Sequence, residues 1–319
     1  MDILVIKLGA LGDVINTLPL IINLKRHLGA RIHWVVEPLS FPIVSAHRCV
    51  DNAICFNKQA WKQSLPEVLS EIRSRRYDLC LDLQRITKSA LLCMAAKATR
   101  RIGFDRERCK EMTWLFPFER IPASDPKKHM VLQYLDFAEY LGIADNEIRW
   151  DIPVKGSVPF NLPEGYVVLN IGATKAANKW TPGGFASLAE EVRERYHIPC
   201  VLTGAGEDIK MAAEITRRAS NSIIDLVGKT SIEDLIEVLA GSSAVVSCDT
   251  GPMHLGVALG KEVIALFGPA NPRRTGPYLG HVIQKDLACS GCNKRTCSDP
   301  VCMLSIRSED VLEKLDLVL

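Results

Sequence analysis

The chain has 319 residues, of which 47% are hydrophobic and 24% are charged, and its formal net charge is +2. This composition excludes a disordered or fibrous protein, and the length exceeds the usual size of one hydrophobic core, so we expect two domains of about 150 residues each. Lys7 and Asp13 interrupt the short apolar run at the start, and no stretch approaches the ~20 apolar residues of a membrane span. We therefore expect a cytoplasmic protein without a signal peptide, whose contact with any membrane would be peripheral.

Short apolar runs alternate with helical segments through the first half of the chain. Strands are predicted at residues 3–8, 31–36, 53–56, 78–83 and 100–104. A helix is predicted from residue 15 to a stop at Gly29, and another at residues 64–76. This alternation is typical of a parallel sheet with crossover helices.

Residues 142–163 carry three prolines without any sustained period, and they form the best linker candidate. The predicted domains are therefore residues 1–155 and 156–319. In the second domain, strands are predicted at 166–172, 198–204, 223–228, 244–248 and 262–268, with helices beginning near residues 181, 207, 231 and 251 and a terminal helix capped by Ser308. The fold class is α/β, with two Rossmann-like doubly wound domains expected to face each other across a ligand-binding cleft.

A glycine-containing turn, Gly9-Ala10-Leu11-Gly12-Asp13, follows the first predicted strand. Its spacing differs from the GxGxxG pattern of dinucleotide binding, which disfavours a nicotinamide-dependent oxidoreductase. Asp13 lies where a carboxylate could take a proton from an acceptor hydroxyl. Alternatively, Asp13 caps the helix that follows.

Residues suited to a nucleotide diphosphate follow several strands of the second domain. Thr250 and Gly251 lie at a predicted helix start, a natural seat for phosphate, and His254 lies one turn further along. Asp249 and Thr250 could instead be helix caps, and His254 a buried core histidine.

Two further strands of this domain end in polar residues. Thr174 and Lys179 could clamp a diphosphate, and Glu207, or equally its neighbour Asp208, could hold a ribose hydroxyl. Each signal is weak alone, but together they favour a nucleotide diphosphate ligand.

Positive charge is concentrated in the first domain. Residues 1–155 hold 23 Lys and Arg against 18 Asp and Glu, whereas residues 156–319 hold 16 against 19. Residues 85–110 alone carry eight basic side chains against two acidic ones, and Arg85, Lys88 and Arg101 are candidates for binding an anionic acceptor or membrane face. The alternative is a solvated helix face. Phe104 is the one aromatic residue among these charges, which is too few for the interleaving that single-stranded nucleic-acid binding favours, so nucleic acid is not the expected partner.

The chain contains eleven cysteines, which do not suggest a disulfide framework in a protein without an export signal. Seven are scattered and are expected to be small core residues. Cys289, Cys292, Cys297 and Cys302 are clustered, and they could hold a structural zinc ion, form a reducible disulfide or remain free thiols.

Several segments taken in order resemble glycosyltransferase family 9, the ADP-heptose:lipopolysaccharide heptosyltransferases. These include KLGALGDVINTLPLI, YDLCLDLQRITKSAL, LTGAGED and CDTGPMHLGVALG, and the resemblance covers essentially the whole chain. The body resembles the heptosyltransferase I branch, while the tail CSGCNKRTCSDPVCM is closer to the heptosyltransferase II branch.

The resemblance implies a GT-B fold and metal-independent, inverting transfer of heptose from ADP-heptose to the inner core of lipopolysaccharide, either Kdo-lipid A or a heptosyl acceptor. Asp13 matches the general base of the family. The positions that match donor contacts are Thr174, Lys179, Glu207, Asp249, Thr250, Gly251 and His254. The alternatives are a family 9 transferase for another sugar or acceptor, a nucleotide-sugar epimerase or hydrolase, and a non-catalytic nucleotide-binding module.

Overall fold

The computed structural model describes residues 1–219 and 223–319, which form two compact units. The first unit is Met1–Pro153 and the second is Val154–Leu319. The division therefore falls two residues before the boundary expected from the sequence, inside the proline-containing linker.

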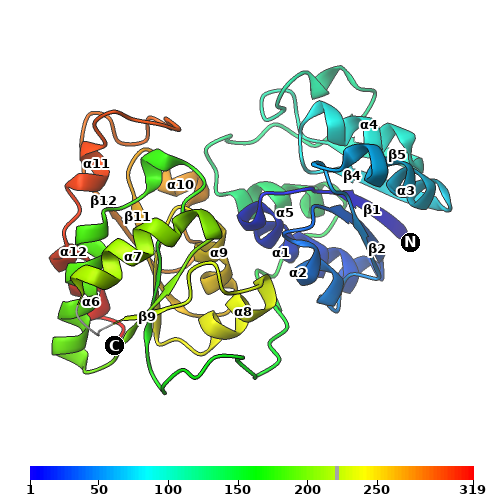
Figure 1. The fold of residues 1–319 in the computed structure, drawn as a ribbon. Helices are drawn as coiled ribbons and strands as arrows, with labels where there is room; N and C mark the ends of the chain where they lie inside the picture. Colours follow the sequence, from blue (N-terminus) through cyan, green and yellow to red (C-terminus); the bar gives the residue numbers. More distant parts are fainter. Residues whose placement is uncertain (220–222) are drawn as a thin grey trace. The chain divides into compact units, whose positions relative to one another are not determined.

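A six-stranded parallel sheet forms the centre of the first unit (Figure 1). Its strands lie in the order β3-β2-β1-β4-β5-β6, which is the strand order of a Rossmann fold. The five predicted strands are confirmed, and the short β6 is an addition. The strand bounds are β1 (Asp2–Ile6), β2 (Arg31–Val36), β3 (Asn52–Cys55), β4 (Arg76–Asp82), β5 (Lys97–Gly103) and β6 (Glu119–Arg120).

Helices cover both faces of this sheet. They are α1 (Leu11–Leu28), α2 (Phe41–Ala46), α3 (Trp61–Arg73), α4 (Thr87–Ala95) and α5 (Met130–Tyr140), with a 3-10 turn η1 (Thr113–Leu115). Helix α1 ends as predicted, because Gly29 adopts the left-handed conformation with φ 56°. It begins at Leu11 rather than near residue 15, so Asp13 lies in its first turn.

Alternation along β1 decides which residues face which helices. Leu4 and Ile6 pack in one apolar cluster with Val68 of α3 and Ala90 of α4. Successive side chains of a strand point to opposite faces. Lys7 therefore lies on the other face, where α1 packs against α5.

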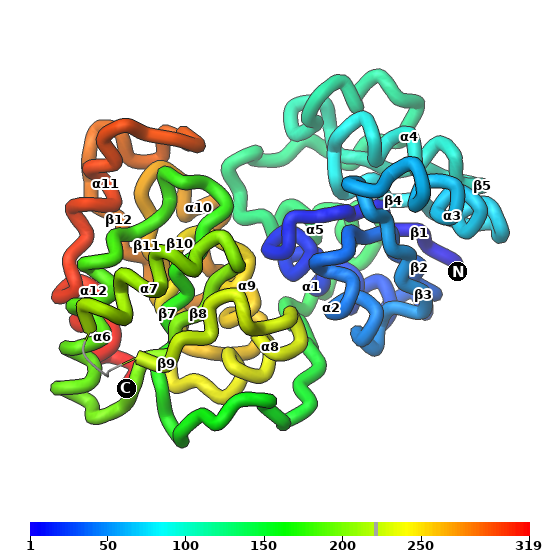
Figure 2. Tube along the Cα trace, in the orientation of Figure 1, coloured from blue at the N-terminus to red at the C-terminus, as the bar shows by residue number. Residues whose placement is uncertain are grey.

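The second unit repeats this topology, and the trace in Figure 2 follows it from β7 onward. Its strands lie in the order β12-β11-β10-β7-β8-β9, again a Rossmann order. The strand bounds are β7 (Val167–Asn170), β8 (Cys200–Thr203), β9 (Ile223–Asp225), β10 (Ala244–Cys248), β11 (Glu262–Phe267) and β12 (His281–Gln284). The helix bounds are η2 (Ala176–Asn178), α6 (Pro182–Tyr196), η3 (Gly206–Asp208), α7 (Ile209–Arg218), α8 (Ile232–Ala240), α9 (Gly251–Ala258), α10 (Pro272–Thr275), α11 (Val301–Leu304) and α12 (Ser308–Leu315).

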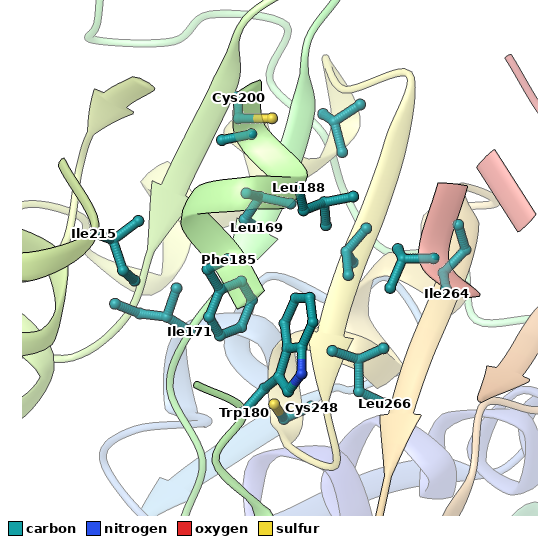
Figure 3. Packing of buried hydrophobic residues seen from close by; sticks show 14 of the residues in the cluster. Leu169, Ile171, Trp180, Phe185, Leu188, Cys200, Ile215, Cys248, Ile264 and Leu266 are labelled. Carbon is teal, nitrogen blue, oxygen red and sulfur yellow. The ribbon is translucent and has the colours of Figure 1, made fainter. Parts of the chain in front are cut away.

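The core of the second unit is built around Trp180 and Phe185, whose rings meet edge to face with centroids 4.9 Å apart (Figure 3). The indole of Trp180 also donates to the carbonyl of Ile306 at 3.0 Å, which ties the chain just after η2 to the terminal segment. This anchoring fixes Lys179, the residue before Trp180, at the edge of the core.

One helix cap was predicted wrongly. Arg307, not Ser308, occupies the N-cap of α12, and its amide donates to Asp310 at 2.8 Å. The hydroxyl of Ser308 instead donates to Glu191 of α6 at 3.0 Å. The side chain predicted to cap its own helix therefore makes a hydrogen bond to a different helix.

Candidate active site

The candidate site of the first unit lies where β1 and β4 end. These strands pair in parallel, with Ile6 opposite Asp82, so the loops that follow them leave from the same edge of the sheet. The side-chain oxygen of Gln84 accepts hydrogen bonds from the amides of Leu8, at 3.1 Å, and Gly9, at 3.3 Å. The glycine turn after β1 is thereby fastened to the loop after β4.

Asp13 forms an ion pair with a buried lysine. The Nζ atom of Lys7 donates to Oδ2 of Asp13 at 2.9 Å, and 1% of the Lys7 side chain is exposed against 32% of the Asp13 side chain. The same ammonium group lies 5.6 Å from the ring centroid of Tyr134 on α5. Ala10 occupies the N-cap of α1, so the alternative in which Asp13 caps this helix is wrong.

Neighbouring cations keep the Asp13 carboxylate ionised. Burial alone would raise its pKa, but the charge and hydrogen bond of Lys7, together with the charges of Arg85 and Lys110, hold the pKa below its ordinary value. Burial likewise disfavours the charged form of Lys7, but Asp13 raises the pKa of Lys7 above its ordinary value. A partly exposed carboxylate that is ionised at neutral pH has the protonation state that a general base requires.

Arg85 is buried beside this pair in an unusual conformation. Its φ of 69° lies in the left-handed region, which disfavours a side chain other than glycine by about 1 kcal/mol. Only 4% of the residue is exposed, and its guanidinium stacks on the ring of Phe104 at 4.7 Å. Among residues 1–219 and 223–319, no carboxylate lies within ion-pair distance of this guanidinium, and its Nε atom is without a hydrogen-bond partner. Arg85 is therefore a buried cation without a directly bonded counter-ion near a proposed catalytic carboxylate.

The other two residues of the predicted anion-binding group do not join Arg85. The guanidinium of Arg101 donates to the backbone carbonyls of Cys93, Ala96 and Ala98, at distances between 2.7 and 3.2 Å. Lys88 is exposed on α4. The three candidates for acceptor binding therefore lie in different environments: Arg85 is buried, Arg101 is bonded to backbone carbonyls and Lys88 faces solvent.

The candidate site of the second unit lies where β7 and β10 end, at the equivalent position of its own sheet. Asn170 donates to the hydroxyl of Ser247 at 3.2 Å and accepts from that of Thr203 at 3.3 Å. These buried polar residues join the carboxyl ends of β8, β7 and β10. The loops carrying the predicted donor contacts therefore begin from one rigid edge.

Lys179 and Asp208 form an ion pair at this edge. Asp208 is buried and also accepts from the amide of Ala205 at 3.1 Å, whereas Glu207 is exposed. A Cβ atom at Gly172 would come within 2.8 Å of the Asp208 carboxylate, so glycine is needed there for the close approach. Of the two acidic candidates in this loop, Asp208 is the one that orients Lys179.

The remaining predicted donor contacts surround the start of α9. Thr250 takes the N-cap position and Gly251 begins the helix, as the phosphate-seat prediction requires. Asp249 accepts a hydrogen bond from Asn178 at 3.1 Å, which links this start to η2. His254 is buried inside α9, while Thr174 is exposed after β7.

The four clustered cysteines do not fit a metal site as they lie. Cys289, Cys292 and Cys297 are exposed and Cys302 is buried, and all four are free thiols. In the described part of the chain, no three His, Cys, Asp or Glu side chains converge as a metal ion would require. Structural zinc at these cysteines stays a prediction from their spacing, and the metal content of the purified protein would test it.

Sequence reasoning missed Lys7 and Gln84 and left Asp208 as an alternative. Lys7 carried a usable signal, because a lysine at the end of an apolar strand of a parallel sheet is expected to be buried and paired. Gln84 carried no comparable signal, since its role depends on the pairing of β1 with β4.

Two units, each with a parallel sheet of Rossmann strand order and charged residues where its first and fourth strands end, have the architecture of the GT-B fold. The sequence pattern of glycosyltransferase family 9 (heptosyltransferase) matches residues 67–302. The chain belongs to this family.

Relatives and solved structures agree with this assignment. The chain is 29% identical to lipopolysaccharide heptosyltransferase 1 of Pseudomonas aeruginosa, over 93% of this chain and 88% of the relative. It is 26% identical to lipopolysaccharide heptosyltransferase 1 of Escherichia coli K12, over 99% of each chain. The fold matches that of the E. coli heptosyltransferase WaaC with ADP, with a TM-score of 0.82, 24% identity and complete coverage of both chains. It also matches E. coli ADP-heptose heptosyltransferase II, with a TM-score of 0.80, 22% identity and coverage of 100% and 98%.

Replacing Lys7 by Met should raise the pKa of Asp13, because burial of the carboxylate remains while its closest cation is lost. The pKa can be measured by following the 13C shift of the Asp13 carboxyl carbon during a pH titration. Lys58→Met, which removes the exposed partner of Glu37, is the matched control. An Asp13 pKa that is unchanged in Lys7→Met would show that Lys7 does not control its ionisation.

Proposed function

We propose that this protein transfers a heptose from ADP-heptose to an anionic, lipid-linked acceptor of the lipopolysaccharide inner core, with inversion at the anomeric carbon. The names of its relatives support the donor and the acceptor class. The observation that carries the proposal is the partly exposed Asp13 carboxylate, held ionised by buried Lys7 at the end of β1.

Asp13 acts as the general base of a single displacement. The acceptor hydroxyl loses its proton to the Asp13 carboxylate while its oxygen attacks the anomeric carbon. A new carbon–oxygen bond forms as the bond to the diphosphate breaks, and ADP leaves with the bonding electron pair. The ion pair with Lys7 orients the carboxylate and keeps it ready to accept the proton.

The second unit binds the nucleotide sugar. Lys179 and the amides at the start of α9, after Thr250 and at Gly251, stabilise the negative charge that grows on the departing diphosphate. His254 contributes from within the same helix, and Thr174, Glu207 and Asp249 complete the proposed donor contacts. Fixed protein charges thus take the part that a divalent cation plays in other transferases.

Arg85 binds a negatively charged group of the acceptor. A buried guanidinium without a bonded carboxylate is unfavourable, and a carboxylate or phosphate of the acceptor would supply the missing partner. Its influence on the pKa of Asp13 indicates that such a group would lie near the hydroxyl to be activated.

The protein would work in the cytoplasm, at the inner face of the inner membrane, where a lipid-linked acceptor is presented. Within residues 1–219 and 223–319, no helix is long and apolar enough to cross a bilayer. The proposed association with the membrane is therefore peripheral.

Asp13→Asn should lower kcat by at least ~100-fold, since the amide cannot accept the proton, while the affinity for ADP should change little. Product formation can be followed by mass spectrometry, with ADP binding measured by calorimetry. Asp51→Asn is a matched control, because Asp51 also pairs with a lysine, Lys25, on the surface of the same unit. Near-normal turnover of Asp13→Asn would remove Asp13 from the mechanism.

Lys179→Ala should weaken ADP binding by about tenfold or more, because it removes a charged hydrogen-bond donor to the diphosphate. Lys229→Ala, which changes an exposed lysine of the same unit, should bind ADP normally.

Transfer by the unmodified protein should continue in EDTA. A full loss of activity in EDTA that Mg²⁺ restores would contradict the proposed charge stabilisation by the protein alone.

Arg85→Gly should raise KM for the acceptor by roughly 10- to 100-fold, because the variant loses the binding free energy of a charged hydrogen bond. KM for ADP-heptose should change little. Glycine suits the left-handed backbone at this position, so the variant removes the guanidinium without adding strain. Lys97→Ala, at an exposed position of β5, is the control. An unchanged acceptor KM would show that Arg85 does not contact the acceptor.

A further inference from the structure

Five large apolar side chains are exposed on α4 and on the segment 112–115 of the first unit. Their exposure ranges from 38% to 62%, well above what a core-packed side chain retains. We call them the apolar patch, and its members are Leu91, Met94, Met112, Trp114 and Leu115. Isolated exposed apolar residues are ordinary, but a group of them marks an interaction surface.

Hydrogen bonds hold the two segments of the patch together. Leu91 and Met94 lie three residues apart on α4, so they share one face of this helix. The segment that carries the other three is fastened to the start of α4, because the Glu111 carboxylate accepts from the amide of Thr87 at 2.6 Å. The amide of Lys110 also donates to the carbonyl of Arg85 at 3.2 Å.

Basic residues are frequent in the two segments that carry the apolar patch and in the stretch between them. Residues 87–115 contain seven Lys and Arg against three Asp and Glu. Internal ion pairs engage Arg108, with Asp105 and Asp136, and Arg100, with Glu119. Lys88, Lys97, Arg106 and Lys110 are exposed, as are the acidic residues Glu107 and Glu111. The guanidinium of Arg106 lies 4.4 Å from the centroid of the Trp114 ring.

We infer that the apolar patch and the exposed basic residues of the same stretch dock this protein on the surface of an anionic bilayer. Tryptophan with aliphatic side chains and flanking Lys and Arg is the combination that binds the interface of such a membrane. The inference rests on the proposed function, because a lipid-linked acceptor is what would bring the protein to a membrane. The segment bearing Trp114 is hydrogen-bonded to the backbone carbonyl of Arg85, the proposed acceptor contact. A lipid-linked acceptor would thereby meet the site from the surface on which the patch is docked.

Co-sedimentation of the full chain with vesicles tests this inference without requiring catalysis. The unmodified protein should bind vesicles that contain phosphatidylglycerol, bind phosphatidylcholine vesicles poorly, and lose affinity as salt rises. The double variant Trp114→Ser/Leu115→Ser should bind phosphatidylglycerol vesicles at least about tenfold more weakly, because it removes two anchoring side chains. Leu39→Ser/Leu279→Ser, which changes two leucines outside the patch that are 59% and 64% exposed, should bind as the unmodified protein does.

Two further measurements separate the possible failures. Turnover of an acceptor without acyl chains should be the same in Trp114→Ser/Leu115→Ser as in the unmodified protein, which would show that the variant is folded. Lys88→Glu is a second variant that should also weaken vesicle binding. Equal binding of all proteins to both vesicle types would overturn the docking surface while leaving the transferase proposal intact. Self-association of the unmodified protein that the double variant abolishes, seen by sedimentation velocity, would also overturn it, because the patch would then be an interface between copies. Vesicle binding with no transfer to any acceptor would instead contradict the proposed function.

Discussion

The pairing of the first with the fourth strand is the constraint on which the candidate site of each unit depends. In each sheet the strand order reverses direction at this pair, β1 with β4 and β7 with β10. The loops that follow the two strands therefore lead to opposite faces of the sheet and leave a crevice between them. Hydrogen bonds across the pair then fix the loops, through Gln84 in the first unit and through Asn170 with Ser247 in the second. Residues 76 and 77 positions apart in sequence become neighbours for this reason.

Buried charge is what distinguishes the first of these sites from an ordinary strand end. Lys7 is buried only because Asp13 is within hydrogen-bond distance, and Asp13 in turn stays ionised because Lys7 outweighs the effect of burial. Arg85 adds a second cation that has no bonded carboxylate and holds an unfavourable backbone conformation. Strain and an incompletely satisfied charge at one strand end are features that stability alone would not favour.

Most of the fold followed from local sequence patterns, because apolar runs and glycine stops act locally. The strands at residues 31–36 and 244–248 and the end of α1 at Gly29 were predicted correctly. Helix α5 was missed because it is buried on most sides and so lacks a clear polar face. The candidate site was predicted in part: Asp13 and Thr250 lie at strand exits as expected, but the partners that orient Asp13 and Lys179 depend on strand pairing and side-chain direction.

The basic segment illustrates why a charge count does not locate a binding surface. Its arginines divide by the environment that the fold gives them: Arg101 binds backbone carbonyls, Arg108 neutralises two buried carboxylates, and Arg85 lies inside. The exposed basic side chains of this segment are Lys88, Lys97, Arg100, Arg106 and Lys110. The segment and the residues just after it also carry exposed apolar side chains that no charge count would reveal. The same stretch of sequence therefore supplies two different electrostatic features, a buried one suited to a single anionic group and an exposed one suited to an extended anionic surface.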